Sequence, residues 1–304
     1  GMNGDLPEFR PSSLPDWVIL CQDRDIARNE HVAEQKVLHS RLSKAANSHR
    51  SMGSPMKMLA MVFGLFILGL VVLWASRHAI TRSIVQHIPM SWEQQLGDIA
   101  WEQVKAQESL VEDPELAQEL AVVTSKLLKA GERSGYEFRF HIARNDTLMN
   151  AYALPGGNIV VYTGLMKKVR REEQLAGVLA HEMAHVIRRH SLQNMVSKVG
   201  LWVVISTVIG DAGALAAILS ESSQMVLGQK FSRDVETDAD DVAWEILTET
   251  GIDPRGLREF FELLLSEEKA MMGGLMSGPL NWLSTHPSTE ERIERLREKE
   301  ARLP

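Results

Sequence analysis

The chain has 304 residues, of which 44% are hydrophobic and 24% charged, and its formal net charge is −7. This balance excludes a wholly disordered protein, and the acidic surplus argues against a nucleic-acid-binding protein, which needs a basic surface. The single cysteine, Cys21, excludes an intramolecular disulfide and a thiolate metal cluster. A metal in this protein would therefore need histidine and carboxylate ligands.

Residues 1–55 are predicted to form a polar N-terminal tail with no recognisable chemistry. After it, residues 58–76 form a run without one charged side chain, which at about 1.5 Å per residue is long enough to cross the hydrocarbon core of a bilayer. A buried core helix is the alternative, although such a helix usually keeps a polar stripe. We predict one transmembrane helix at residues 56–77, with a lipid bilayer as a partner.

The charges beside this run predict its orientation. Four basic residues precede the run closely and two follow it: Arg41, Lys44, Arg50 and Lys57, then Arg77 and Arg82. Positive charge favours the cytoplasmic side of a span, so the N-terminus is predicted to be cytoplasmic. Residues 91–304 would then face the periplasm as part of a single-pass protein of the inner (cytoplasmic) membrane, or lie at the mitochondrial inner membrane if the source is eukaryotic.

The rest of the chain, residues 91–304, reads as one mostly helical α+β domain. Helical spacing covers 91–130 with a break at Asp113-Pro114, because proline disfavours helical backbone before it and aspartate can cap the helix that begins after it. Residues 136–142 and 159–162 suit strands, joined through a turn at 154–158. Almost everything after them has a helical pattern, and the apolar stretch 199–220 suggests a hairpin that packs in the core or touches a membrane.

The chemistry begins at His181-Glu-Met-Ala-His185, inside a segment from 172 to 190 that reads as one helix. At about 100° per residue the two imidazoles lie only about 40° apart on the helix, so both can bind one zinc ion. Glu182 lies beside that pair and suits a general base acting on metal-bound water. Two packed structural histidines are the alternative interpretation.

A catalytic zinc needs a third protein ligand. On a continuous helix His190 lies about 180° from His181, so we exclude it as a ligand and predict a surface position. Downstream, Glu236 and Asp240 are four residues apart on one helix face. Glu236 can complete a site of two histidines and one glutamate, and Asp240 can accept the second ring N–H of a ligating imidazole. A solvated acidic helix face is the alternative.

Four blocks of sequence now give a family resemblance, which covers about residues 145–300. They are Asn150 to Leu165, His181 to His185, Ser232 to Asp240, and Trp282 to Ser288 with Arg292. The chain resembles the membrane-linked gluzincin zinc metalloendopeptidases, the group of HtpX, the CAAX prenyl proteases and BepA, and is most similar to the OMA-type and BepA-like branch.

The resemblance implies a gluzincin-type domain with a small β-sheet beside the active-site helix, and one Zn²⁺ per chain. The implied ligands are His181, His185 and Glu236, with Glu182 as the general base and Asp240 supporting a ligand. His286 is implied to lie near the metal, where it polarises the substrate carbonyl or occupies the open position. The implied substrate-binding edge is the strand of five residues Asn158, Ile159, Val160, Val161 and Tyr162.

The expected function is that of a membrane-anchored zinc metalloendopeptidase, which hydrolyses polypeptide substrates that are misfolded or membrane-associated. The alternative is a catalytically quiet, chaperone-like binding module that keeps zinc for structure. Glu182 favours the enzyme, because a purely structural site has no need of a base. The sequence does not indicate an oligomeric state or a physiological substrate.

Overall fold

The computed structural model describes residues 2–3, 6–9, 19–20, 54–199, 230–272, 286 and 289–303. The chain divides into two compact units, Gly1–Arg77 and His78–Pro304. In the first unit, three short antiparallel strands pair in the order β1-β2-β3, at Met2–Asn3, Leu6–Phe9 and Ile19–Leu20. The stretch predicted as a plain polar tail therefore contains paired strands. Most of the apolar stretch 199–220 lies outside the described residues.

Helix α3, Ser54–Gln86, begins in the first unit and ends in the second. Every side chain from 57 to 72 is exposed, including large apolar ones such as Leu59 and Phe63. None of the helices in the described part of the chain is both long enough and apolar enough to cross a membrane. The segment predicted as a transmembrane helix is thus helical, but its role as a membrane span is not confirmed.

After the end of α3, the second unit continues with two helices, one on each side of the predicted break. Helix α4 covers Met90–Gln107 and α5 covers Pro114–Glu132. The carboxylate of Asp113 accepts hydrogen bonds from the backbone N–H groups of Glu115 and Leu116, and Pro114 occupies the first turn of α5. This arrangement confirms the expected cap, which satisfies amide groups that the helix itself leaves without partners.

The sheet of this unit has three strands in the order β4-β6-β5. Strand β4, Arg139–Ala143, runs parallel to β6, Asn158–Tyr162, whereas β5, Ala151–Ala153, runs antiparallel to β6. A short 3-10 turn at Pro155–Gly157 joins β5 to β6. Gly157 is required there, since its φ is 108° and a Cβ atom would lie 2.6 Å from the backbone oxygen of Glu137.

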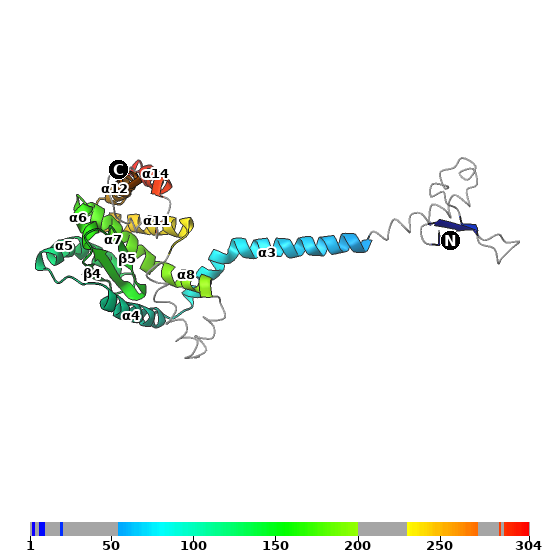
Figure 1. The fold of residues 1–304 in the computed structure, drawn as a ribbon, viewed down its shortest axis with the longest axis horizontal. Coiled ribbons are helices and arrows are strands. Elements are labelled where there is room, and N and C mark those ends of the chain that lie inside the picture. The colour runs from blue at the N-terminus through cyan, green and yellow to red at the C-terminus, as the bar shows by residue number, and fades with distance from the viewer. Residues whose placement is uncertain are drawn as a thin grey trace. The chain divides into compact units, whose positions relative to one another are not determined.

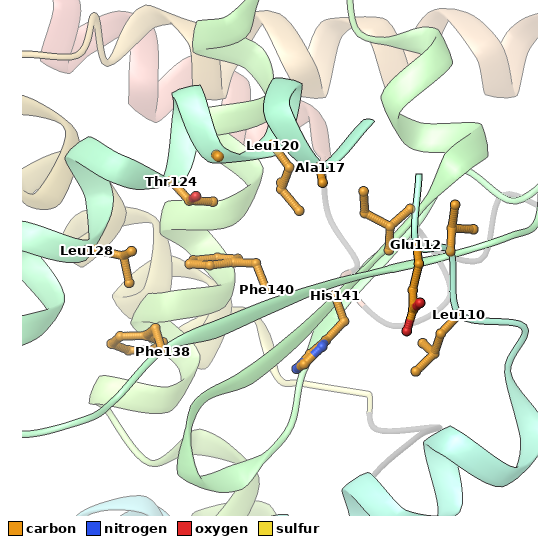
Figure 2. Close-up of a pocket in the computed structure, with 12 residues that line it drawn as sticks. Leu110, Glu112, Ala117, Leu120, Thr124, Leu128, Phe138, Phe140 and His141 are labelled. Atoms are coloured by element: carbon orange, nitrogen blue, oxygen red, sulfur yellow. The ribbon is translucent and has the colours of Figure 1, made fainter. Parts of the chain in front are cut away.

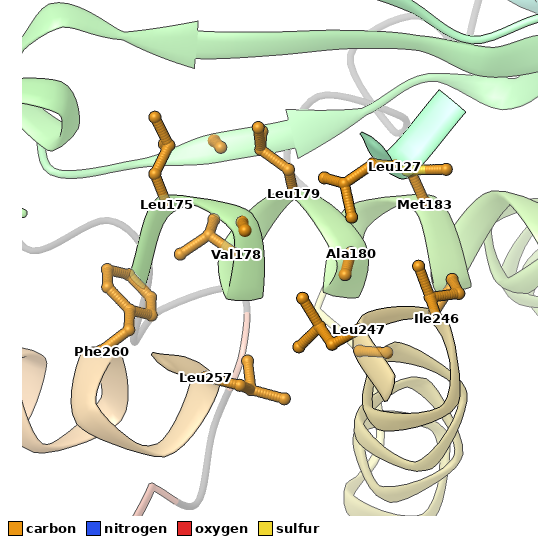
Figure 3. Close-up of a cluster of buried hydrophobic side chains, with 14 of the residues drawn as sticks. Leu127, Leu175, Val178, Leu179, Ala180, Met183, Ile246, Leu247, Leu257 and Phe260 are labelled. Carbon is orange, nitrogen blue, oxygen red and sulfur yellow. The ribbon is translucent and has the colours of Figure 1, made fainter. Parts of the chain in front are cut away.

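The helices after the sheet build the core around α7, Glu172–Ile187 (Figure 1). The others are α6 (Thr163–Lys168), α8 (His190–Val199), α11 (Arg233–Glu249), α12 (Arg255–Met272) and α14 (Thr289–Glu300). Figure 3 shows α7 between the sheet on one side and α11 and α12 on the other, with Leu179 and Met183 toward the sheet and Leu247 and Leu257 on the helices below.

Helix α7 is buried without a break from Gln174 to Val186. It approaches α12 closely because Gly177 and Gly256 have no side chains: a Cβ on Gly177 would lie 2.7 Å from the Cα of Leu257. Burial on all sides makes it costly to leave a polar side chain of this buried stretch without a hydrogen-bond partner. The mostly helical α+β fold with a small sheet beside this helix agrees with the predicted fold class.

Candidate metal site

Helix α7 brings the two predicted histidine ligands together. The Nε2 atoms of His181 and His185 lie 3.1 Å apart, and both imidazoles are almost completely buried. A spacing of four residues places both side chains over the same turn of the helix. The sequence prediction that the two rings face one point is therefore confirmed by the geometry.

Helix α11 carries Glu236, the residue that the sequence predicts as the third ligand. Glu236 is fully buried, with Oε2 3.3 Å from Nε2 of His181 and Oε1 3.7 Å from Nε2 of His185. His286 completes the cluster, because its Nδ1 lies 2.9 Å from Oε1 of Glu236 and 3.4 Å from Nε2 of His181. Candidate ligand atoms of these four residues all lie within 4.8 Å of one another.

These distances test whether the group fits a metal. Two ligands at about 2.0–2.1 Å from a tetrahedral zinc ion lie about 3.3 Å from each other. The separations of 3.1, 3.3 and 3.4 Å between Nε2 of His181 and its three neighbours match that edge length. Imidazole nitrogen and carboxylate oxygen are also the donors that zinc binds. The four residues therefore fit a zinc ion.

Glu182 lies beside this cluster and is itself buried. Its Oε1 is 3.6 Å from Nε2 of His286, and its carboxylate accepts a hydrogen bond from the backbone N–H of Ala153. Burial raises the pKa of Glu182 above its usual value. Within the described residues Oε1 has no hydrogen-bond partner, so a buried acceptor is left over at the metal cluster, as a base for a bound molecule would require.

Asp240 contacts His181, which the sequence predicts as a metal ligand. Its Oδ1 lies 3.0 Å from Nδ1 of His181, on the side of the ring opposite to the metal cluster. Burial alone would raise the pKa of Asp240, but the charge and hydrogen bonds of Arg292 outweigh that effect and lower it. A carboxylate in this position accepts the ring N–H at Nδ1, so the other ring nitrogen, Nε2, is the one that can bind a metal.

Arg292 is a site residue to which sequence reasoning assigns no role. Its Nε and Nη2 each lie 2.7 Å from an oxygen of Asp240, and its Nη1 lies 2.8 Å from Oε2 of Glu236. The guanidinium also stacks over Phe261, 4.1 Å from the ring centre. Two buried carboxylates on α11 would require a buried cation, which could have indicated an arginine at the site. The sequence of α14 is rich in charged residues, so Arg292 cannot be told apart from its exposed neighbours by pattern alone.

The surroundings set the charge of the two histidines differently. For His181, burial lowers the pKa, but hydrogen bonds with Asp240 and Glu236 outweigh burial and raise it to about 9. Burial, and then the charge of His181, lower the pKa of His185 well below its usual value. His181 therefore holds a proton strongly in the metal-free protein, and a metal must displace it.

The prediction that His190 lies on the surface is wrong. His190 is buried, with Nδ1 3.1 Å from Nδ1 of His185 and Nε2 3.2 Å from Oδ2 of Asp238. Helix α7 ends at Ile187, and Arg189 takes a positive φ of 58°, so the chain turns before α8 begins. The 100° rule does not extend across that turn. His190 is not among the four candidate ligands, in line with its exclusion as a ligand.

The prediction that Asn158–Tyr162 forms an exposed edge is also wrong. These residues form β6, the central strand, whose main chain pairs with β4 on one side and β5 on the other. All five residues are buried. Substrate cannot pair with the main chain of β6, because neither edge of the strand is open.

A cavity of about 390 Å³ lies elsewhere, between α5 and β4 (Figure 2). Leu120 and Thr124 of α5 and Phe138, Phe140 and His141 beside or on β4 line it. None of its lining residues belongs to the metal cluster. The candidate site is therefore defined by its buried polar side chains and not by this cavity.

Comparison with known proteins gives the family. Residues 114–300 match the model of peptidase family M48. The chain is 29% identical over 220 residues to the beta-barrel assembly-enhancing protease of Yersinia pestis, and the matched region covers 68% of this chain and 43% of that protein. It is 30% identical over 213 residues to the protein of that name from Escherichia coli K12, covering 66% of this chain and 42% of the relative.

A third relative is the mitochondrial metalloendopeptidase OMA1 of Schizosaccharomyces pombe. It is 30% identical over 180 residues, and the matched region covers 58% of this chain and 50% of that protein. The chain thus spans half or less of the length of these relatives. They confirm the resemblance to the OMA-type and BepA-like branch. The match over residues 114–300 shows that the chain belongs to peptidase family M48.

Proposed function

We propose that this protein is a zinc-dependent endopeptidase. The observation that carries the proposal is the convergence of His181, His185 and Glu236 at tetrahedral spacing with the buried carboxylate of Glu182 beside them. A structural site needs ligands only, whereas Glu182 is a buried base with one oxygen that has no hydrogen-bond partner among the described residues. Relatives with protease and metalloendopeptidase in their names support polypeptides as substrates.

The roles of the residues follow from their positions. Zinc held by His181, His185 and Glu236 would polarise a peptide carbonyl and lower the pKa of a bound water to about 7. Glu182, with its raised pKa, can take a proton from the attacking water and return it to the leaving amine. His286 belongs to the same cluster, so its imidazole competes with substrate for the fourth position that a catalytic site keeps open.

We propose β5 as the substrate-binding strand, in place of β6. It lies at the end of the sheet, and the amide of Ala153 reaches Glu182. Two backbone hydrogen bonds beside β5 show which of its residues face β6. The N–H of Leu154 donates to the carbonyl of Asn158, and the N–H of Tyr162 donates to the carbonyl of Asn150. The main-chain groups of Ala151 and Ala153 therefore point away from β6. The N–H of Ala153 is bonded to Glu182, which leaves the carbonyl of Ala153 as the group with which an extended peptide can pair.

We also propose that α3 attaches the protein to a lipid bilayer, where its substrates are misfolded or membrane-associated proteins. The support is the row of exposed apolar side chains from 58 to 72 and the absence of charge from 58 to 76. The flanking charges favour a periplasmic catalytic domain, or the equivalent side of the mitochondrial inner membrane. Protease treatment of intact cells before and after the outer membrane is opened tests this side.

The central experiment is Glu182→Gln on the full chain, with Glu172→Gln as the matched control, since Glu172 is exposed on the first turn of the same helix. Cleavage of an unfolded protein should fall by about 10²–10⁴-fold in the first variant only. Zinc content should stay at one per chain in both. Unchanged cleavage by Glu182→Gln would overturn the proposed mechanism.

A second variant tests the ligands. Glu236→Ala removes a carboxylate whose two oxygens face both histidines. It should lose bound zinc, which metal analysis after dialysis measures. Retention of one zinc per chain would mean that Glu236 is not the third ligand.

A further inference from the structure

His190 is a buried histidine next to the metal cluster but outside its ligand set. It touches the ligand His185 through one ring nitrogen and Asp238 through the other, at 3.1 and 3.2 Å. Its side chain is 1% exposed, whereas Asp238 is 20% exposed at the far end of the contact. A polar side chain buried at this depth needs a hydrogen-bonding role.

The positions of the ring protons of His185 and His190 follow from the hydrogen-bond donors and acceptors that they contact. Nε2 of His185 faces Glu236 and His181, so a metal bound there leaves the proton of the neutral ring on Nδ1. That N–H points at Nδ1 of His190, which must then be the acceptor. His190 consequently carries its own proton on Nε2, where the carboxylate of Asp238, an acceptor only, receives it.

We propose that His190 and Asp238 form a positioning pair that holds His185 in the tautomer and orientation required for zinc binding. The inference rests on the zinc site of the proposed function. The pair would support His185 as Asp240 supports His181, where the carboxylate oxygen lies directly against Nδ1 of the imidazole, at 3.0 Å. The carboxylate of Asp238 acts here through the intervening imidazole of His190.

The backbone turn at Arg189 places His190 under His185. Its φ of 58° is uncommon for a residue other than glycine, and neighbouring contacts hold it. Nε of Arg189 donates to the buried carboxylate of Glu93, and Nη1 donates to the backbone oxygens of Val85 and Ile88 at 2.7 and 2.9 Å. The side chain of Arg189 therefore anchors the turn that directs the next residue toward the metal cluster.

Asp238 is held in turn by a second contact. Nε of Arg188 lies 3.1 Å from the same Oδ2 that faces His190. The hydrogen bond with His190 is the main reason why the pKa of Asp238 lies below its usual value, so the group is a charged acceptor at neutral pH. Phe231 stacks on the other side of the His185 ring, 4.3 Å between centres, and limits its rotation independently.

Two substitutions of similar size separate positioning from packing. In His190→Asn, the amide oxygen can take the place of Nδ1 and still accept from His185. In His190→Gln, the longer amide reaches the place of Nε2 and Asp238 but leaves Nδ1–H of His185 without an acceptor. Asp238→Ala and its control Asp241→Ala remove one carboxylate each from α11; Asp241 pairs with Arg295 and Lys299 instead.

The first measurement is the zinc affinity of the full-length protein, by competition with a chromogenic chelator. His190→Gln should weaken zinc binding by about 10–100-fold, the usual effect of removing a partner of a metal ligand. His190→Asn should retain most of the affinity, Asp238→Ala should lose about tenfold or less, and Asp241→Ala should match the wild type. Equal losses in the Asn and Gln variants, or no loss in Gln, would overturn the positioning role.

The second measurement is the ¹⁵N shift of the His185 ring nitrogens in zinc-loaded protein, which reports the nitrogen that carries the proton and the strength of its hydrogen bond. The Nδ1–H signal should be strongly hydrogen-bonded in the wild type and His190→Asn and weakly so in His190→Gln. Thermal unfolding of each variant verifies that it folds. If the wild type itself binds no zinc, the proposed function fails; if it binds zinc and all variants match it, only this inference fails.

Discussion

Helices α3 and α7 depart from the usual distribution of side chains in opposite ways: α7 buries polar side chains, and α3 exposes apolar ones. Helix α7 hides two histidines and a glutamate in the centre of the domain, whereas α3 exposes apolar side chains continuously from 58 to 72. Each departs from the ordinary distribution of residues, in which charge lies outside and apolar bulk inside. The buried histidines of α7 have polar partners among the described residues, whereas the apolar side chains of α3 are not covered by any part of the chain that the structure describes.

The largest test of this contrast removes the cation that compensates the buried carboxylates. Arg292→Met leaves Asp240 and Glu236 in the core without their guanidinium and should destabilise the fold by about 3–5 kcal/mol. Arg295→Met, in the same helix, loses only a partly exposed ion pair with Asp241 and should cost about 0–1 kcal/mol. Denaturant unfolding of both variants measures the difference, and equal losses would refute the view that burial governs the cost.

The second test reverses the character of α3. Leu65→Lys with Leu68→Lys places two charges among exposed apolar side chains, each costing about 2.5–3.5 kcal/mol at the centre of a bilayer-spanning helix. Association with phospholipid vesicles should be lost, while thermal unfolding of the His78–Pro304 unit stays unchanged. Val122→Lys, an exposed apolar position on α5, should leave vesicle association as it is. Persisting association of the double variant would contradict bilayer attachment through α3.

A third test compares a glycine from each helix. In Gly177→Ala the new methyl group would lie 2.7 Å from backbone atoms of Leu257, so α7 and α12 must separate, at a cost of about 1–3 kcal/mol. At Gly64 of α3, no atom of the described residues outside the neighbouring backbone of the helix lies within 4 Å of such a methyl group, so Gly64→Ala should not destabilise the protein. Thermal unfolding checks both, and tolerance of Gly177→Ala would show that the α7–α12 contact can relax.

The smallest effect is expected at a half-exposed ion pair between α12 and α14. Burial raises the pKa of Glu262, but hydrogen bonds from Arg297 and Arg258 outweigh it and lower the pKa below the usual 4.5. A depressed pKa contributes stability above about pH 4.5 that is lost as the pH falls through the folded-state value. Glu262→Gln should therefore cost less than about 1 kcal/mol at pH 7, and this cost should disappear in unfolding measured at strongly acidic pH.

The parts of the site that sequence could predict are the local ones. The spacing of His181 and His185, and of Glu236 and Asp240, lies within one helix turn each, so helical periodicity alone places them. The cap at Asp113 is local as well. Their positions are confirmed because no distant contact needs to be known.

The wrong predictions depend on distant residues. The turn before His190 contains no glycine or proline by which the sequence could have indicated it. It is held by a hydrogen bond from Arg189 to Glu93, which lies far upstream in the sequence. Strand β5 has only three residues, too few to show a pattern, and without it β6 looked like an edge. Arg292 is recognisable only once Asp240 and Glu236 are known to be buried.

The ion pairs of Arg292 with Glu236 and Asp240 set the net charge of the buried site. With neutral imidazoles, the carboxylates of Glu182, Glu236 and Asp240 and the one guanidinium leave this buried cluster at −2. A divalent cation cancels that charge, whereas a monovalent one does not. Removing the metal should therefore draw protons into the protein, and chelation in weakly buffered solution should show this uptake once the protons that the chelator releases, measured with zinc alone, are subtracted.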